Sequence, residues 1–452
     1  MKFRKTALAV ALTMSLTVLA GCDQSAKKEV PELKATTQET VQTQATGLRT
    51  LKHGDENGFY CFSRGDAPGR SKLCYVDYAT GTAKPLCEKS DCEADCPACL
   101  PLSEHGAEVW VLDENTLVLL YDVIQDGASA ADSQVCIDLA DRDGSNRRNL
   151  LRGKQPEYDA VFIGNMMADS EALYFGLNGE QGGLCRIALD GSGVQQIYHN
   201  GQWSVEAQPL KNKLIAVTNH RADQVIYEKN TITKDTPADE VQRIYEESER
   251  TPTRWLIAIN PTDGHFTELI QWEQEGDTAR NFLTDEDRVW WLTQGGEIGW
   301  IKLDGTTGVL DVQWPAELKN PEPDMFLNAA GLRIVQGKLL VQPQFIEDEA
   351  HSKMKSQYAI DLETGEVAPI AMEYIAYDCR RPVSIVEESE KGLLVIQQET
   401  VEKAEKVYGD GTVVDDVYRP SLAPISHEDF FNGNPDYQSI QISCDLDSRK
   451  WW

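Results

Sequence analysis

Four cysteines lie close together in the sequence, with the spacing Cys87-x4-Cys92-x3-Cys96-x2-Cys99. Four thiolates are a ligand set for tetrahedral zinc, and Cys96-x2-Cys99 has the spacing of one zinc knuckle. The same cysteines could instead form disulfides, which are favoured in the oxidising environment outside the cytoplasm. They could also remain thiols if the cell lives without oxygen. The spacing therefore predicts a structural zinc site or a local set of disulfides, with free thiols as a third reading.

The other cysteines outside the N-terminal segment divide into one candidate pair and four scattered residues. Cys61 and Cys74 lie on either side of an expected hairpin turn, where adjacent strands could join them. The remaining four fall within β-like runs and are expected to be small core residues: Cys136, Cys185, Cys379 and Cys444. No flanking residues mark any of these as a reactive thiolate, so a catalytic cysteine is not expected.

Common catalytic motifs are missing from the sequence. It contains no G-x-x-x-x-G-K-[ST], G-x-G-x-x-G, G-x-S-x-G or H-E-x-x-H. The seven histidines are scattered, and the 73 acidic residues are too numerous to single out a glycosidase pair. Trp290, Trp291 and Trp300 could stack on a sugar, but the first two would face opposite sides of a strand. The sequence therefore favours a binding protein over an enzyme, and an enzyme is kept as the alternative.

The N-terminal segment has the order of parts of an export signal. Lys2, Arg4 and Lys5 precede a weakly apolar run from Thr6 to Gly21, which is too short for a comfortable transmembrane helix. Residues 19–22 read Leu-Ala-Gly-Cys and resemble the lipobox of bacterial lipoproteins. The resemblance implies removal of the signal peptide 1–21 and attachment of acyl chains, such as palmitate, at Cys22. The polar residues 22–50 are expected to form a flexible linker.

The charge of the chain excludes several kinds of partner. The sequence has 43 Lys and Arg against 73 Asp and Glu, a formal net charge of −30. Nucleic-acid binding depends on Lys and Arg that neutralise phosphates, so a nucleic-acid partner is not expected. The same charge opposes docking on an anionic membrane through the protein surface. Membrane contact is therefore expected through the lipid at Cys22 alone.

A repeated unit follows the linker. Each copy is a β-rich run, a second run, and a turn that contains Asp-Gly or Thr-Gly, as in Asp190-Gly191, Asp304-Gly305 and Thr364-Gly365. Such small sheets cannot bury their apolar faces alone and must stack, which is typical of propeller blades. First strands are expected to open near Phe59, Leu117, Leu173, Leu214, Val289, Leu339 and Leu393.

These seven openings predict an all-β fold, a β-propeller of about seven blades, with six to eight compatible with the spacing. A pair of β-sandwiches is the alternative. We expect a single domain over 51–452, with insertions near 228–253 and 402–434. The first insertion has the start signals of a helix, and the second is polar and turn-rich and is expected to loop out of the last blade.

The repeats around 184–193 and 300–305 resemble those of secreted TolB-like and receptor-type propellers, which many clostridial lipoproteins carry. The resemblance covers short repeats and implies the fold without a function. Residues 86–99 also resemble an element of those lipoproteins that reads LC-x4-C-x-H-x4-C. Ala94 stands where that element has His, and Cys96 is additional. If the element binds a metal, Cys96 would replace the missing ligand.

The sequence thus predicts a lipid-anchored propeller on the extracytoplasmic face of the cell membrane. It is expected to bind a surface protein or a glycan without catalysis. The alternatives are an extracytoplasmic carbohydrate-active enzyme on a propeller scaffold and an envelope assembly or scaffold subunit.

Overall fold

The computed structural model describes the chain from residue 47 to residue 446, apart from short internal gaps and two longer ones. The residues outside the description are 1–46, 65–69, 90–91, 93–95, 102–106, 124–133, 155–158, 179–182, 200–204, 219–236, 239–240, 243–253, 273–280, 294–295, 317–324, 349–350, 355–356, 377–378, 409–410, 445 and 447–452. The predicted signal peptide 1–21, Cys22 and most of the linker therefore lie outside the described residues.

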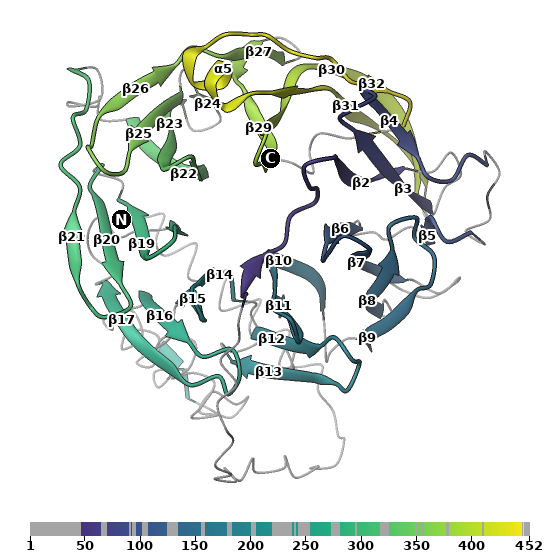
Figure 1. The fold of residues 1–452 in the computed structure, drawn as a ribbon, viewed down its shortest axis with the longest axis horizontal. Coiled ribbons are helices and arrows are strands. Elements are labelled where there is room, and N and C mark those ends of the chain that lie inside the picture. Colours follow the sequence, from purple (N-terminus) through teal and green to yellow (C-terminus); the bar gives the residue numbers. More distant parts are fainter. Residues whose placement is uncertain are drawn as a thin grey trace.

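Seven small sheets stand in a ring around a central axis, which confirms the predicted seven-bladed propeller (Figure 1). We number the sheets as blades one to seven in chain order. Blades one to three consist of β2 (Gly58–Arg64), β3 (Arg70–Asp77), β4 (Thr82–Pro85), β5 (Cys99–Pro101) and β32 (Gln441–Ile442); β6 (Glu108–Val111), β7 (Thr116–Val123), β8 (Gln134–Asp141) and β9 (Arg148–Lys154); and β1 (Arg49–Thr50), β10 (Asp159–Ala168), β11 (Ala172–Asn178), β12 (Gly183–Ala188) and β13 (Val194–Tyr198).

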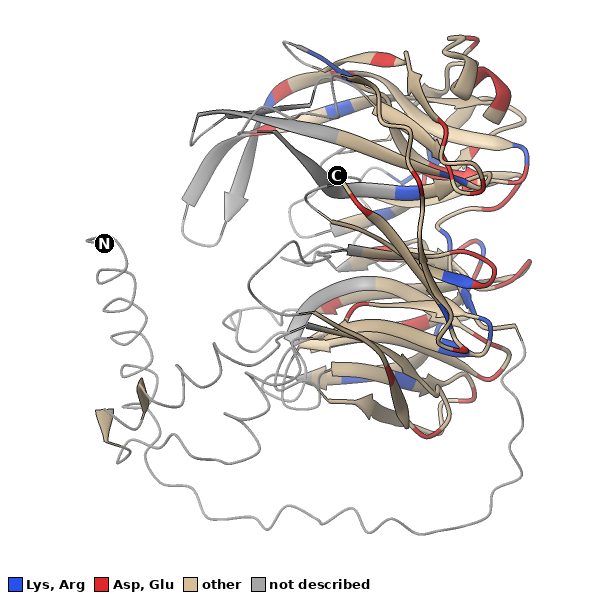
Figure 2. Ribbon diagram, turned by 90° about the vertical axis from the view of Figure 1, so that its left-hand side faces the viewer, with Lys and Arg blue, Asp and Glu red and all other residues tan. Residues whose placement is uncertain are grey.

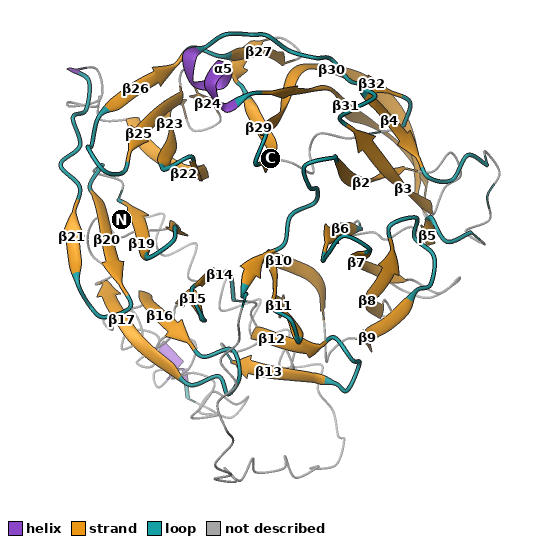
Figure 3. Ribbon diagram, viewed as in Figure 1, coloured by secondary structure: helices purple, strands orange, loops and turns teal. Residues whose placement is uncertain are grey.

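Blades four to six are antiparallel, blade seven contains a parallel pair between β27 and β30, and strands dominate the described chain (Figure 3). Blades four to seven consist of β14 (Ala207–Leu210), β15 (Lys213–Thr218), β16 (Arg254–Ile259) and β17 (Phe266–Trp272); β18 (Asn281–Thr284), β19 (Arg288–Leu292), β20 (Ile298–Lys302) and β21 (Thr307–Val309); β22 (Met325–Val335), β23 (Lys338–Asp348), β24 (His351–Met354), β25 (Gln357–Asp361) and β26 (Val367–Ile370); and β27 (Glu373–Ala376), β28 (Cys379–Pro382), β29 (Ser384–Ser389), β30 (Gly392–Tyr408) and β31 (Gly411–Ile425).

The seven strands expected from the sequence each fall in a different blade, as β2, β7, β11, β15, β19, β23 and β30. They are second strands rather than first strands, because a strand nearer the axis precedes each of β7, β11, β15, β19, β23 and β30. In blade one this inner position is held by an isolated bridge between Gly54 and Phe59. Several inner strands are only four residues long and have no clear apolar alternation, so the sequence does not reveal them.

The predicted turns close hairpins between the outer strands of blades one to six. Their glycines have a positive φ, for example 64° at Gly81 and 75° at Gly365, a conformation that costs glycine little. The Asp361 carboxylate accepts hydrogen bonds from the Glu363 and Thr364 amides at 3.0 and 2.9 Å. The hydrogen bond from the Thr364 amide has the largest effect, and together these bonds lower the pKa of Asp361 to about 2, although burial alone would raise it.

In the side view, Asp and Glu follow the turns along one face of the ring, with Lys and Arg among them (Figure 2).

One turn glycine, Gly365 of blade six, lies close to the backbone that follows blade five. A Cβ at Gly365 would overlap the carbonyl oxygen of Asp311, whereas a Cβ at Gly305 would meet nothing within 4 Å. Both residues have positive φ, 75° and 85°. We expect Gly365→Ala to destabilise the fold by roughly 3 kcal/mol, because backbone strain and overlap add. The control Gly305→Ala should cost about 1 kcal/mol, from strain alone. Urea unfolding measures both, and equal losses would mean that the Asp311 contact is unimportant.

The apolar core is distributed around the ring between neighbouring blades. One cluster joins blades two and three and includes Ile137 and Phe175, and another joins blades three and four and includes Tyr174 and Ile257. The remaining clusters lie in the same way at the other interfaces. This distribution follows from the size of the sheets, because each small sheet buries its faces only against its neighbours.

The N-terminal segment crosses several blades along their inner edges. The Leu51 amide donates to Met166 in blade three, and the Lys52 carbonyl accepts from Val111 in blade two, both at 2.8 Å. The His53 amide then donates to the Glu387 carboxylate of blade seven at 2.8 Å. Figure 1 shows this segment near the axis. It therefore ties together blades that are distant in the sequence.

The C-terminal segment closes the outer edge of the ring. β32 pairs in parallel with β4 of blade one, and the Gln441 amide donates to the Gly81 carbonyl at 2.8 Å. On the other side, the Ile440 amide donates to the Leu422 carbonyl of β31 at 3.0 Å. The segment is thus hydrogen-bonded to both the first and the last blade.

The structure describes little of the expected insertion near 228–253 and most of the one near 402–434. Within 228–253 the structure describes only residues 237–238 and 241–242, so the expected helix lies mostly outside the described residues. Residues 402–434 do not loop out: β30 and β31 continue as one long hairpin, followed by helix α5 (His427–Asn432). Their polar residues suit paired strands because opposite charges face each other, as with Lys403 and Asp416 at 2.6 Å. None of the helices in the described residues is both long and apolar enough to span a membrane.

Candidate metal centre

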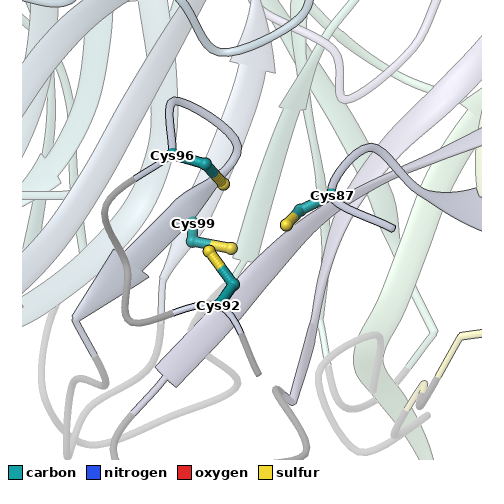
Figure 4. A group of neighbouring side chains, drawn as sticks. All are labelled: Cys87, Cys92, Cys96 and Cys99. Atoms are coloured by element: carbon teal, nitrogen blue, oxygen red, sulfur yellow. The ribbon is translucent and has the colours of Figure 1, made fainter. Parts of the chain in front are cut away.

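The four clustered cysteines come from the connection that follows β4 and from the start of β5. Cys87 lies two residues after β4, Cys92 and Cys96 lie in the connection, and Cys99 is the first residue of β5. Their sulfur atoms all lie within 4.8 Å of one another. Figure 4 shows the four side chains pointing toward a common centre. The structure therefore brings together all four residues that the spacing singled out.

Backbone hydrogen bonds to Leu73 of β3 hold both arms of the connection. The Leu86 amide donates to the Leu73 carbonyl, and the Leu73 amide donates to the Ala98 carbonyl, both at 2.8 Å. The Cys99 amide donates to the Cys96 carbonyl at 3.2 Å and closes the tight turn between these two cysteines. Because β3 binds both arms, Cys87 and Cys99 are placed beside each other independently of any metal.

Residues of blades one and two support the connection from outside. The Arg147 guanidinium of blade two donates to the carbonyl oxygens of Pro97 and Cys99, the latter at 3.0 Å. The Lys72 ammonium donates to the Lys89 carbonyl at 3.0 Å, within the segment between Cys87 and Cys92. These cationic side chains position the backbone that carries the thiols.

The thiols are mostly removed from solvent. Cys87, Cys92 and Cys99 are at most 5% exposed, and Cys96 is half-buried. Burial raises the pKa of Cys99 well above its usual value, and the thiols of Cys96, Cys92 and Cys87 raise it further. Burial would also raise the pKa of Cys87, but hydrogen bonds from the neighbouring thiols, Cys96 first, bring it below its usual value. The surroundings therefore oppose ionisation of Cys99 and favour that of Cys87.

The donor set can hold a metal ion. In a tetrahedral zinc site with Zn–S bonds of about 2.3 Å the sulfurs lie ~3.8 Å apart, so the observed group needs only a small contraction. Four thiolates and no carboxylate favour zinc over the hard cations magnesium and calcium. Four protein ligands would also leave no open position, which is typical of a structural site rather than a catalytic one. Ala94, which replaces the His of the resembled element, lies outside the described residues.

Five of the cysteines outside the group of four lie in the strands of several blades. Cys61 and Cys74 lie directly opposite each other on β2 and β3. Cys136 and Cys185 are fully buried, and the side chain of Cys379 lies outside the described residues. All nine cysteines whose side chains the structure describes are thiols rather than disulfides.

The three tryptophans do not form an exposed platform. Trp290 is 1% exposed, and its indole N–H donates to the Asp285 carboxylate at 2.6 Å. The Arg288 guanidinium lies 5.3 Å from the centre of the Trp290 ring and 5.1 Å from that of Trp300. Trp291 packs against Gly299 and the ring of Trp272. The three tryptophans therefore pack within blade five and against its neighbours.

A cavity that the sequence does not reveal lies at the seam between blades one and seven. Its volume is about 430 Å³, and its lining includes Tyr78, Lys391, Ile425 and Tyr437. Burial raises the pKa of Tyr78, so this phenol stays protonated and can donate a hydrogen bond. The lining residues come from segments more than 300 positions apart, so only ring closure assembles them. The mixed polar and apolar lining suits a small polar ligand.

No protein-family model matches the chain, and no curated protein matches its sequence. Solved structures match at low identity. Dipeptidyl peptidase 4 of Porphyromonas gingivalis has a TM-score of 0.44 and 12% identity, over 90% of this chain and 60% of its own. A prolyl endopeptidase has a TM-score of 0.42 and 10% identity over 84% of this chain; the match spans only 47% of that enzyme. TolB from Acinetobacter baumannii has a TM-score of 0.30 and 13% identity, over 70% of this chain and 66% of its own. These likenesses concern the fold alone.

Proposed function

We propose that this chain is a lipid-anchored, extracytoplasmic binding protein that presents a seven-bladed propeller to a protein or glycan at the bacterial cell surface. The observation that carries the proposal is the ring of seven small sheets, whose connections are surface loops on a rigid support. The buried cysteine group suits a structural metal within blade one. The lipobox resemblance around Cys22 supports the proposed location. The ring of blades supplies rigid support for surface loops, which commonly carry recognition.

Cys87, Cys92, Cys96 and Cys99 would hold a zinc ion, whose positive charge would allow the four thiols to ionise together. The chain's own residues then do the structural work. A bound ion would hold together the segment from Cys87 to Cys99, where the Arg147 guanidinium donates to the Cys99 carbonyl. Its role is to stabilise one blade interface, so partner binding takes place elsewhere on the ring.

The binding role is tested with the full-length protein in detergent, incubated with a panel of surface glycans and, separately, crosslinked in envelopes. We expect retention of a glycan or of one surface protein without chemical change of the glycan. Turnover of any glycan would replace the binding role by that of a carbohydrate-active enzyme. One stoichiometric envelope complex that resists dilution would instead indicate an assembly or scaffold subunit.

A further inference from the structure

The cavity at the seam between blades one and seven is built from three separate stretches of chain. Glu56 and Tyr78 flank the first hairpin of blade one, Lys391 lies in the turn between β29 and β30, and Asp436 and Tyr437 lie between α5 and β32. Backbone hydrogen bonds hold these stretches: the Tyr78 amide donates to the Asn57 carbonyl at 3.1 Å, and the Tyr437 amide donates to the Pro435 carbonyl at 2.9 Å. The walls are therefore preformed, which lowers the cost of binding.

Two tyrosines give the cavity aromatic surface and available hydroxyl groups. Tyr78 and Tyr437 are partly buried and pack against the apolar cluster that joins blades one, six and seven. Within the described residues, neither phenol hydroxyl has a hydrogen-bond partner. Burial raises the pKa of both phenols, so both stay protonated and can donate. Since sheltered polar groups in proteins are normally hydrogen-bonded, these two hydroxyls are suited to meet a ligand.

The charged groups around the cavity have both signs. The Lys391 ammonium lies 3.9 Å from the Glu56 carboxylate, and the two side chains are 68% and 55% exposed, so the pair is weak and both can turn to a ligand. Asp436 adds a second carboxylate. Two carboxylates against one ammonium, on a chain with a net charge of −30, oppose an anionic ligand.

The lining therefore combines donors, acceptors and an apolar wall. The phenols, the Lys391 ammonium and the Gln438 amide can donate, the carboxylates can accept, and Leu394 and Ile425 are apolar. A sugar has the same combination, because each hydroxyl both donates and accepts while the C–H face of the ring stacks on aromatic groups. The volume of about 430 Å³ falls in the range of about 300–1,000 Å³ typical of small-molecule sites.

We propose that this seam cavity binds a short neutral saccharide, such as the end of a surface glycan. The inference rests on the proposed function, of which it names the glycan site. The ligand would contact blade one, blade seven and the segment before β32 at the same time, so it would also stabilise the closed ring. A ligand that binds only the folded protein raises its melting temperature.

The test uses the full-length protein in a detergent without a sugar headgroup. Glucose, galactose, mannose, N-acetylglucosamine and their disaccharides are titrated by calorimetry, with glucuronate as the anionic comparison. We expect one neutral saccharide to bind more tightly than glucuronate. At about a hundred times its Kd it should raise the melting temperature by about 4 °C.

Matched variants locate the site. Tyr437→Phe keeps the ring and removes the hydroxyl, and Lys391→Gln removes an exposed charge; each should weaken saccharide binding about tenfold. The controls are Tyr75→Phe and Lys84→Gln, which alter a partly buried tyrosine and an exposed lysine of blade one outside the cavity lining. Both controls should bind as the wild type does.

Unchanged affinity of both cavity variants would overturn the seam site and leave glycan binding elsewhere on the ring. Binding of glucuronate alone would also overturn it, because the ligand would then be anionic. If the wild type binds none of these saccharides, the inference fails, and the proposed function stands only if the envelope crosslinking yields a surface-protein partner. Failure of both experiments would overturn the proposed function as well.

Discussion

A Cys22→Ser protein is expected to lose membrane retention almost completely and to appear in the soluble extracytoplasmic fraction. Acyl chains contribute about 0.8 kcal/mol per buried CH₂ group, so their loss removes the main attraction to the bilayer. The protein surface offers little replacement, because a net charge of −30 is repelled by anionic lipids. Fractionation followed by immunoblotting measures the change.

The control for this experiment is Cys444→Ser, which replaces a cysteine far from the lipobox and should pellet with membranes as the wild type does. If Cys22→Ser still pellets after washing at high salt, the lipobox interpretation of residues 19–22 is wrong. Metabolic labelling with a fatty acid gives a second measurement, since only the wild type and the control should incorporate the label.

Cys99→Ser is expected to reduce bound zinc from one ion per chain to near zero and to destabilise the fold by roughly 3 kcal/mol. Cys99 is a donor at the start of β5, and its loss leaves three thiols around a cation that prefers four. The control is Cys136→Ser, because Cys136 belongs to the same apolar cluster while its sulfur lies outside the group of four. This control should keep its zinc.

Elemental analysis, thiol counting and thermal unfolding measure these effects. Acidification should release the metal from the wild type, because the four cysteines must be deprotonated to bind it and protons compete for them. A wild-type protein with no zinc and no reactive thiols among the four would establish disulfides there instead. Zinc retained by Cys99→Ser at the wild-type level would place the metal elsewhere.

Local signals in the sequence were sufficient for the repeated part of the fold. Asp-Gly and Thr-Gly turns mark hairpins because few other residues accept the positive φ found at Gly81 and Gly365. Apolar second strands such as β11 and β15 are buried between blades and are visible as continuous runs. The four clustered cysteines were found for the same reason, since all lie within thirteen consecutive residues.

Ring closure was not predictable, because it joins segments that are remote in the chain. β32 has only two residues, and nothing in its composition indicates that it pairs with β4. The sequence predicts Cys444 to be a small core residue, and the structure places it, partly buried, against the apolar cluster that joins blades one, six and seven. The charges after residue 402 suggest solvent exposure and so predict a loop, whereas charge pairs across β30 and β31 allow this stretch to be strand.

The placement of the two chain ends has a consequence for the order in which the protein is made and folded. β1 is synthesised before any blade, yet its partners are Met167 and Ala168, which emerge more than a hundred residues later. Blade one also remains without β32 until residues 441–442 have been made. Contacts between such distant residues make folding slow, and an incomplete chain exposes unpaired strand edges that promote aggregation. A nascent chain that ends before β32 is therefore expected to be prone to aggregation until the last strand closes the ring.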